Sequence, residues 1–338
     1  MTGSQKGSSH AIFTDDPATA RDRFLRAAAT VGMPVKAFPG QAANDPPLVC
    51  DVGRLGSPDA PTAIVVASNA PGMAGFVGAG ACTAILHDRL QHYLNAKTSL
   101  ILVHAVNPAG SVWPAQSPHP PLPKATDKEP TPPPIGDPAW TDQLLSAAED
   151  RYNSYLAANA ARKAEAAAAD RRAKGLLGKP VWTADTVKTI AKTYLETPKF
   201  VLFLDFRTGP ENWGEVAVHT TASKTSEHLA RAQRWFAAGL ADESYTDGSC
   251  PVAGGFPAYL DGTVNAMSVV VEIGTLVTGG FLEAEQARQQ NYSPYPNGDD
   301  WRDRSRLIIH KVMKEAMDGA AEMAGSIDVV KTKTDPRP

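Results

Sequence analysis

The sequence predicts an α/β protein built on a parallel or mixed β-sheet. Short apolar runs typical of strands alternate with segments of helical periodicity along most of the chain. One of these runs, residues 100–106, is apolar throughout, which is typical of a strand buried on both faces. No internal repeat interrupts the alternation. With 338 residues the chain can bury one large core, and we predict a single domain over residues 1–338.

The first elements follow from local signals. Asp16 and Pro17 supply a cap and a first-turn proline for a helix ending near Val31. Apolar residues at helical spacing predict a second helix over residues 76–95. Runs of β-forming residues between Pro, Gly and Asp turns predict strands at 35–38, 48–52, 62–67 and 100–106.

The middle of the chain has the sharpest change in composition. Residues 108–138 form a proline-rich insert that cannot pair as a central strand. An Ala/Lys/Glu/Arg-rich stretch follows, and its propensity predicts a long helix over residues 140–174.

The second half returns to alternating elements. We predict strands at residues 200–206, 215–220 and 267–273. Helices are predicted at 183–195, 223–240, 281–290 and 304–323, with a glycine-rich loop at 246–258.

Composition argues against several classes of function. The formal net charge is -3 and the pI is about 6.2, so the chain has no global attraction for nucleic acid or anionic membranes. Three widely spaced cysteines without a C-x-x-C pair argue against a disulfide framework and against a structural zinc site. The first ten residues lack an apolar core typical of a signal peptide, and no apolar run reaches the ~20 residues that span a bilayer. We expect a soluble, cytoplasmic protein, and a homo-oligomer is compatible with this.

Three motifs close predicted strands, at the edge where open α/β sheets place their active sites. They are S-N-A-P-G-M-A-G-F at residues 68–76, D-F-R-T-G at 205–209 and V-E-I-G-T at 271–275. Together with L-V-H-A-V-N-P-A-G at 102–110, they resemble the zinc carboxypeptidase superfamily of carboxypeptidase A type. The resemblance is nearest to its branch of unknown function, DUF2817. It implies a three-layer helix-sheet-helix fold with a mixed, largely parallel sheet.

The resemblance also implies a zinc site whose ligands this chain lacks. The branch has T-H-G-x-E-G-F and D-x-H-T-G where this chain has Pro71, Ala74 and Arg207 in place of His, Glu and His. The side chains of Pro71 and Ala74 offer no donor atom, and a guanidinium repels a metal cation. The eight histidines form no H-E-x-x-H or similar cluster, and His104 is expected to be a hydrogen-bonded structural histidine. We therefore expect no metal and no cofactor.

The family's recognition segment for a terminal carboxylate, which ends in N-R-N, is also missing. In its place the proline-rich insert follows Trp113. Carboxypeptidase specificity is therefore not expected.

Glu272 remains at the position of the family's general acid/base. Arg207 would place a positive charge beside it and either keep the carboxylate ionised or bind an anionic substrate group. The pair could equally be an inert ion pair. Residues expected to bind substrate around these two are Asn69, Trp113, Asp205, Asn212 and Trp213.

Three functions are compatible with these residues. The preferred one is a metal-free, repurposed enzyme that uses Glu272 on a small amino-acid-like or carboxylate-bearing compound bound in the cleft. The alternative is a pseudopeptidase that binds or scaffolds a partner without catalysis. A zinc peptidase or amidase with relocated ligands is the least favoured.

Overall fold

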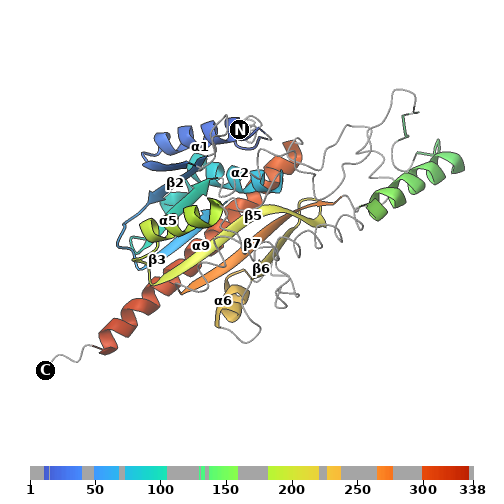
Figure 1. Ribbon diagram of the computed structural model, residues 1–338. Coiled ribbons are helices and arrows are strands. Elements are labelled where there is room, and N and C mark those ends of the chain that lie inside the picture. The colour runs from blue at the N-terminus through green and yellow to red at the C-terminus, as the bar shows by residue number, and fades with distance from the viewer. Residues whose placement is uncertain are drawn as a thin grey trace, which may run out of the picture.

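The fold was established from a computed structural model (Figure 1). It describes residues 11–14, 16–39, 49–67, 73–104, 129, 131–133, 137–158, 182–220, 227–236, 265–276 and 299–334. The glycine-rich loop at 246–258 and the helix predicted at 281–290 lie outside the described residues, as does most of the proline-rich insert.

A seven-stranded mixed sheet forms the middle of the molecule, in the order β1-β2-β4-β3-β5-β7-β6. Its central strands β4, β3, β5 and β7 are parallel, whereas β1, β2 and β6 pair antiparallel at the two sides. The strands are β1 (Val35–Pro39), β2 (Val49–Leu55), β3 (Thr62–Ala67), β4 (Thr98–His104), β5 (Phe200–Asn212), β6 (Val216–Thr220) and β7 (Ala266–Leu276). The predicted mixed sheet is confirmed.

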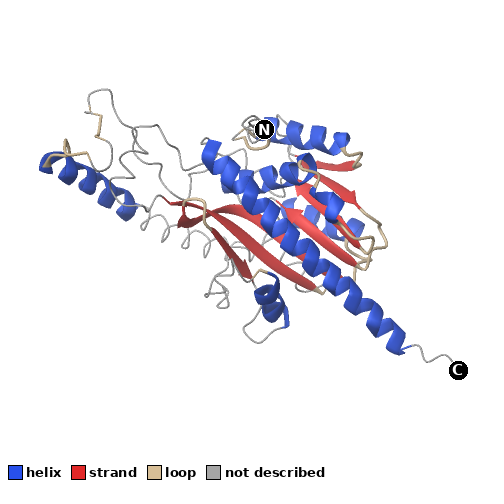
Figure 2. Ribbon diagram, turned by 180° about the vertical axis from the view of Figure 1, so that it is seen from behind, coloured by secondary structure: helices blue, strands red, loops and turns tan. Residues whose placement is uncertain are grey.

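Helices cover both faces of this sheet, which makes three layers (Figures 1 and 2). The helices α1 (Pro17–Thr30), α2 (Met73–His87) and α9 (Asp299–Thr334) pack over one face, together with α6 (Glu227–Trp235) near its edge. Helix α5 (Trp182–Tyr194) packs over the other face. Each face has its own hydrophobic cluster, because side chains alternate between the two faces along every strand.

Helix α1 begins as its sequence predicts. The carboxylate of Asp16 accepts a hydrogen bond from the Thr19 backbone N–H at 2.7 Å, and Pro17 occupies the first turn. Phe24 and Ala28 are buried on the face that meets the sheet. The Phe24 ring stacks on His104 with a centroid distance of 4.8 Å.

The helix predicted over residues 76–95 differs from the structure at its end. Helix α2 stops at His87, and a short 3₁₀ turn, η2 (Leu90–Tyr93), follows. Arg89 separates them with a left-handed backbone, φ 55°, a conformation that a continuous α-helix does not allow.

A charged cluster joins the end of α2 to the long helix α9. Asp88 accepts hydrogen bonds from Arg306 Nε at 2.7 Å and His87 Nδ1 at 2.9 Å, and its Oδ2 atom lies 2.6 Å from His310 Nε2 on α9. Burial raises the pKa of Asp88, but the hydrogen bonds from Arg306, His87 and His310 outweigh this and lower it to about 2. The carboxylate therefore stays ionised and ties the two helices together.

Three elements extend further than their sequence patterns predicted. Strands β5 and β7 continue past residues 206 and 273, and α9 spans 36 residues. The helix predicted over 140–174 is described for residues 142–158, which lie well away from the sheet in Figure 1.

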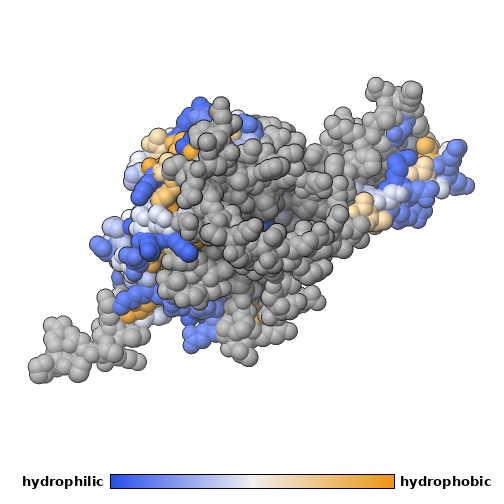
Figure 3. Space-filling view, viewed as in Figure 1, coloured by the Kyte–Doolittle hydropathy of each residue, from blue (hydrophilic) through white to orange (hydrophobic). Residues whose placement is uncertain are grey.

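The described surface in Figure 3 mixes hydrophilic and hydrophobic side chains. Within the described residues, none of the helices combines the length and apolar character needed to cross a membrane.

Candidate active site

Arg207 and Glu272 face each other across two parallel strands. They are direct Cα partners in the ladder between β5 and β7, in the carboxyl-terminal halves of both strands. Val201 and Phe203 of β5 pack in the cluster on the α5 side of the sheet. Arg207 lies an even number of residues after them, so alternation places its side chain, and that of its partner Glu272, on the same side.

The two side chains form a buried ion pair. Arg207 Nη2 lies 2.9 Å from Glu272 Oε1, and the side chains are only 9% and 6% exposed. Opposite charges this close attract each other more strongly in a buried site than in water, because the effective dielectric constant is lower. The structure thus brings together the two residues that the strand-end motifs singled out.

His219 is a third member of this site, and sequence reasoning missed it. It lies on β6, where it pairs with Val270, two residues before Glu272 on the same face of β7. Its Nε2 atom lies 3.4 Å from Glu272 Oε2, and the side chain is 9% exposed. The strand predicted over residues 215–220 contains His219, but only the pairing of β6 with β7 shows which residue His219 meets.

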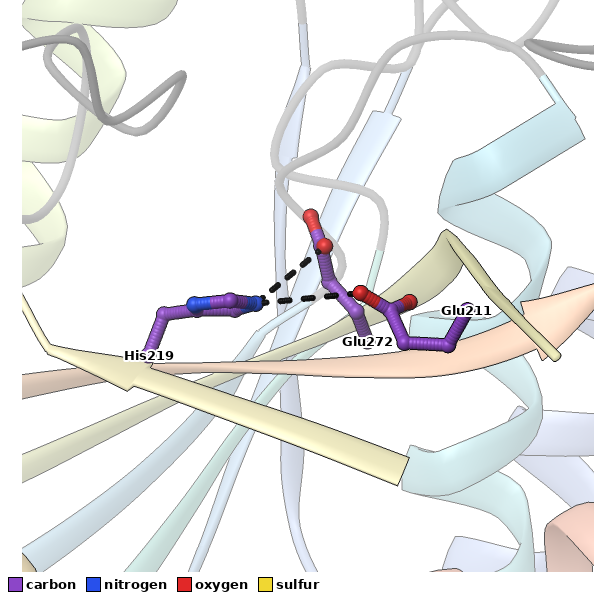
Figure 4. Close-up of side chains that lie close together, drawn as sticks. All are labelled: Glu211, His219 and Glu272. Carbon is purple, nitrogen blue, oxygen red and sulfur yellow. Dashed lines mark ion pairs between the residues drawn. The ribbon is translucent and has the colours of Figure 1, made fainter. Parts of the chain in front are cut away.

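Glu211 completes the group from the extended end of β5. Its Oε1 atom lies 4.0 Å from His219 Nε2, and its side chain is 19% exposed. Figure 4 shows the polar ends of Glu211, His219 and Glu272 turned toward one another. Their nearest ligand atoms all lie within 4.8 Å of one another.

Gly209 leaves the space in which the two carboxylates lie. A Cβ atom added at this position would meet a carboxylate oxygen of Glu211 and stand 2.5 Å from Glu272 Cβ. A side chain here would therefore displace both glutamates. The D-F-R-T-G motif thus contributes the positive charge of Arg207 and, at Gly209, the space that the Glu211 and Glu272 side chains occupy.

The electrostatics of the site favour an ionised Glu272. Burial raises the pKa of Glu272, but nearby His219 and the positive charge of Arg207 lower it and outweigh the burial, so the pKa lies below its usual range. The carboxylate is therefore negatively charged at neutral pH.

The other expected site residues are placed less closely. Asp205 is buried on β5, two residues before Arg207 and on the same face. Trp213 is partly buried and packs against the cluster on the α1, α2 and α9 side. Asn212 ends β5, with a side chain outside the described atoms, and Asn69 and Trp113 lie outside the described residues.

His104 lies at the end of β4, on the opposite face of the sheet from Arg207. It is fully buried, and within the described residues neither ring nitrogen makes a hydrogen bond. Burial lowers its pKa to about 4. Its stacking on Phe24 agrees with a structural role, but the hydrogen bonds expected for it are not among those of the described part.

The residues that the resemblance places at zinc-ligand positions do not fit the metal. Arg207 carries a permanent charge, and its guanidinium forms an ion pair at the place where the resembled enzymes have a ligand histidine. The sequence positions of the other two ligands hold Pro71 and Ala74, whose side chains have no donor atoms. No step of a reaction is therefore assigned to zinc at that position.

Comparison with known proteins gives a family and several distant structures. The sequence matches the family described as "Protein of unknown function (DUF2817)" over residues 13–117 and 177–321. No curated protein matches.

Among solved structures, a carboxypeptidase A candidate from Shewanella denitrificans has 12% identity and a TM-score of 0.48, with 89% of this chain and 69% of that chain covered. A carboxypeptidase candidate from Burkholderia mallei has 11% identity and a TM-score of 0.48, covering 90% and 68%. A glutaminyl cyclase from Fimbriiglobus ruber has 10% identity and a TM-score of 0.42, covering 91% and 92%.

Proposed function

The chain belongs to the DUF2817 family, and we propose that it is a metal-free, repurposed enzyme of the carboxypeptidase fold. Glu272 acts as its general acid/base on a small amino-acid-like or carboxylate-bearing compound. The observation that carries this proposal is the buried ion pair between Arg207 and Glu272, 2.9 Å long.

The positive charge of Arg207 replaces part of what a metal cation would supply. It stands at the position of a zinc ligand in the resembled family and lowers the pKa of Glu272. A carboxylate kept ionised in a low-dielectric site can accept a proton from a substrate group placed against it. In this mechanism Glu272 takes the proton from the reacting atom and returns it to the leaving atom, while Arg207 stays charged throughout.

Arg207 also explains the proposed class of substrate. A guanidinium has five N–H donors in a planar fork, so one edge can hold Glu272 while another receives a carboxylate. The segment that recognises the substrate carboxylate in the resembled family is absent, and Arg207 is the proposed substitute. Asp205 would orient the strand end, whereas Asn69, Trp113, Asn212 and Trp213 would contact the rest of the ligand.

One observation favours a non-catalytic pseudopeptidase instead. Both oxygens of Glu272 have a close basic neighbour, Arg207 on one side and His219 on the other. A carboxylate held in this way could have a purely structural role, in which it holds the neighbouring strands together. The cleft or the proline-rich insert would then bind a partner. Under this alternative the protein would bind its ligand without turning it over.

Activity screening with matched variants tests the proposal. Wild-type protein treated with a chelator would be incubated with N-acyl amino acids, amino-acid amides and cyclic amino-acid derivatives, and products would be measured by mass spectrometry. We expect turnover that survives chelation, is lost in Glu272→Gln and is retained in Glu215→Gln, which changes an exposed glutamate on the neighbouring turn. Turnover that Glu272→Gln leaves intact would refute the role of Glu272. Ligand binding without turnover in every case would support the pseudopeptidase.

A further inference from the structure

Glu272 divides its two carboxylate oxygens between different neighbours. Oε1 contacts Arg207 at 2.9 Å, whereas Oε2 faces His219 Nε2 at 3.4 Å. Oε2 is buried, and within the described part of the chain it makes no hydrogen bond. The 3.4 Å separation is longer than the N–H···O hydrogen bonds usual in proteins, about 2.7–3.2 Å. Glu272 Oε2 therefore lies next to the His219 imidazole without a hydrogen bond to it.

The spacing of the three ligand atoms is close to that around a metal ion. Zinc binds nitrogen and carboxylate oxygen at about 2.0–2.2 Å, so two neighbouring ligands of a tetrahedral ion lie roughly 3.4 Å apart. His219 Nε2 and Glu272 Oε2 already have this separation, and Glu211 Oε1 is 4.0 Å from the same nitrogen. All three ligand atoms lie within 4.8 Å of one another, and a shift of the Glu211 side chain, the most exposed of the three, would be needed to bring its oxygen to ligand spacing.

We propose that Glu211, His219 and Glu272 bind a divalent transition-metal cation such as Zn²⁺, and that this cation inhibits the protein. One imidazole nitrogen and two carboxylate oxygens are ordinary ligands for such an ion. The site differs from the zinc position of the resembled family, because it uses a histidine of β6 and a glutamate at the end of β5. The inhibitory effect rests on the proposed function: a cation on Oε2 would occupy the oxygen with which Glu272 accepts a proton.

Arg207 sets the strength of this site. The charges of the two carboxylates and of the Arg207 guanidinium sum to -1, so a dication is attracted. The guanidinium on the other oxygen of Glu272 nevertheless repels it. Binding should therefore be weak and reversible rather than permanent. Mg²⁺ should compete poorly, because it prefers six oxygen ligands in octahedral geometry.

Calorimetric titration of the metal-stripped full chain with Zn²⁺ tests the site without any substrate. Co²⁺ would be added in parallel, since its visible absorption reports the nitrogen and oxygen ligands directly. We expect one saturable site in the wild type. His219→Ala and Glu211→Gln should each weaken binding by more than the roughly 10–100-fold that loss of an outer-shell partner costs. Arg207→Met should strengthen it by on the order of tenfold, because a like charge is removed.

Two residues outside the site provide matched controls, the exposed Glu215 on the turn before β6 and the partly buried His228 on α6. Glu215→Gln and His228→Ala should bind Zn²⁺ as the wild type does, and circular dichroism would verify that every variant is folded. The proposal is wrong if the wild type shows no saturable site up to millimolar Zn²⁺. It is equally wrong if folded Glu211→Gln and His219→Ala keep the wild-type affinity. If Zn²⁺ binds at these residues and raises turnover instead of lowering it, the inhibitory role and the metal-free function both fall while the binding site stands. If no cation binds, the proposed function is unaffected.

Discussion

Arg207 and Glu272 are Cα partners in the ladder between two parallel strands, and their side chains form an ion pair of 2.9 Å that is more than nine-tenths buried. Burial of two charges is costly, and a pair of this kind persists only where each charge compensates the other. Removing one partner therefore affects stability as well as chemistry. A functional test of this pair has to separate the two effects.

A double-mutant cycle makes that separation. Glu272→Gln keeps the shape of the side chain but removes the negative charge that Arg207 Nη2 contacts, which we expect to cost about 3 kcal/mol in the free energy of unfolding. Arg207→Met should cost a similar amount. The double variant should be less destabilised than the sum of the two, with a coupling of about 1–3 kcal/mol measured by urea denaturation. Simple additivity would show that the two charges do not stabilise each other.

Much of the architecture could be predicted from the sequence because its signals are local. The cap at Asp16, the apolar run around Leu102 and the alternation of strands with helices each depend on neighbouring residues. The helix predicted over residues 76–95 runs past the observed end of α2, because the left-handed backbone at Arg89 is not marked by a glycine in the sequence.

The site was predicted only where it lies on the strand-end motifs. Arg207 and Glu272 belong to those motifs, whereas His219 meets Glu272 through the antiparallel pairing of β6 at the edge of the sheet. That pairing joins residues far apart in the chain, so no periodic pattern in the sequence predicts it. Glu211 was missed because Gly209 and Pro210 suggest a turn, although β5 continues through both.

Gly209→Ala should damage the site through space rather than charge. The new Cβ would stand 2.5 Å from Glu272 Cβ and collide with the Glu211 carboxylate, so one strand or both side chains must move. We expect a loss of about 1–3 kcal/mol in stability from overpacking, together with loss of turnover or Zn²⁺ binding. Gly325→Ala in α9 is the matched control, because an added Cβ there meets nothing within 4 Å. That change should be neutral or stabilising by about 0.5–1 kcal/mol.

Ordinary carboxypeptidase substrates should not be cleaved. The resemblance implies that Pro71, Ala74 and Arg207 replace the zinc ligands and that the proline-rich insert replaces the carboxylate-binding segment, so we expect neither a zinc-activated water nor that anchor. Release of carboxy-terminal residues from a panel of peptides would be followed by mass spectrometry. Release that disappears in Glu272→Gln would contradict the prediction, whereas release that persists in this variant would indicate a contaminating peptidase.

Asp88 should make the stability of the protein depend on pH in the acid range. Its pKa is about 2 in the folded chain against an ordinary value of 3.8, so the folded state binds this proton less readily than the unfolded state. The stabilisation is therefore present above about pH 4 and is lost as the pH falls toward 2. At neutral pH it amounts to about 2 kcal/mol.

Asp88→Asn should remove this contribution. The variant should be less stable than the wild type at pH 7, and the difference should shrink as the pH is lowered from 4 to 2, measured by denaturant unfolding at each pH. Asp318→Asn is the matched control, because Asp318 also pairs with a cation on α9 but is 68% exposed. An exposed pair contributes little to stability, so this control should follow the wild-type curve within about 0.5 kcal/mol. Equal curves for Asp88→Asn and the wild type would mean that the cluster of Arg306, His87 and His310 does not stabilise the ionised carboxylate.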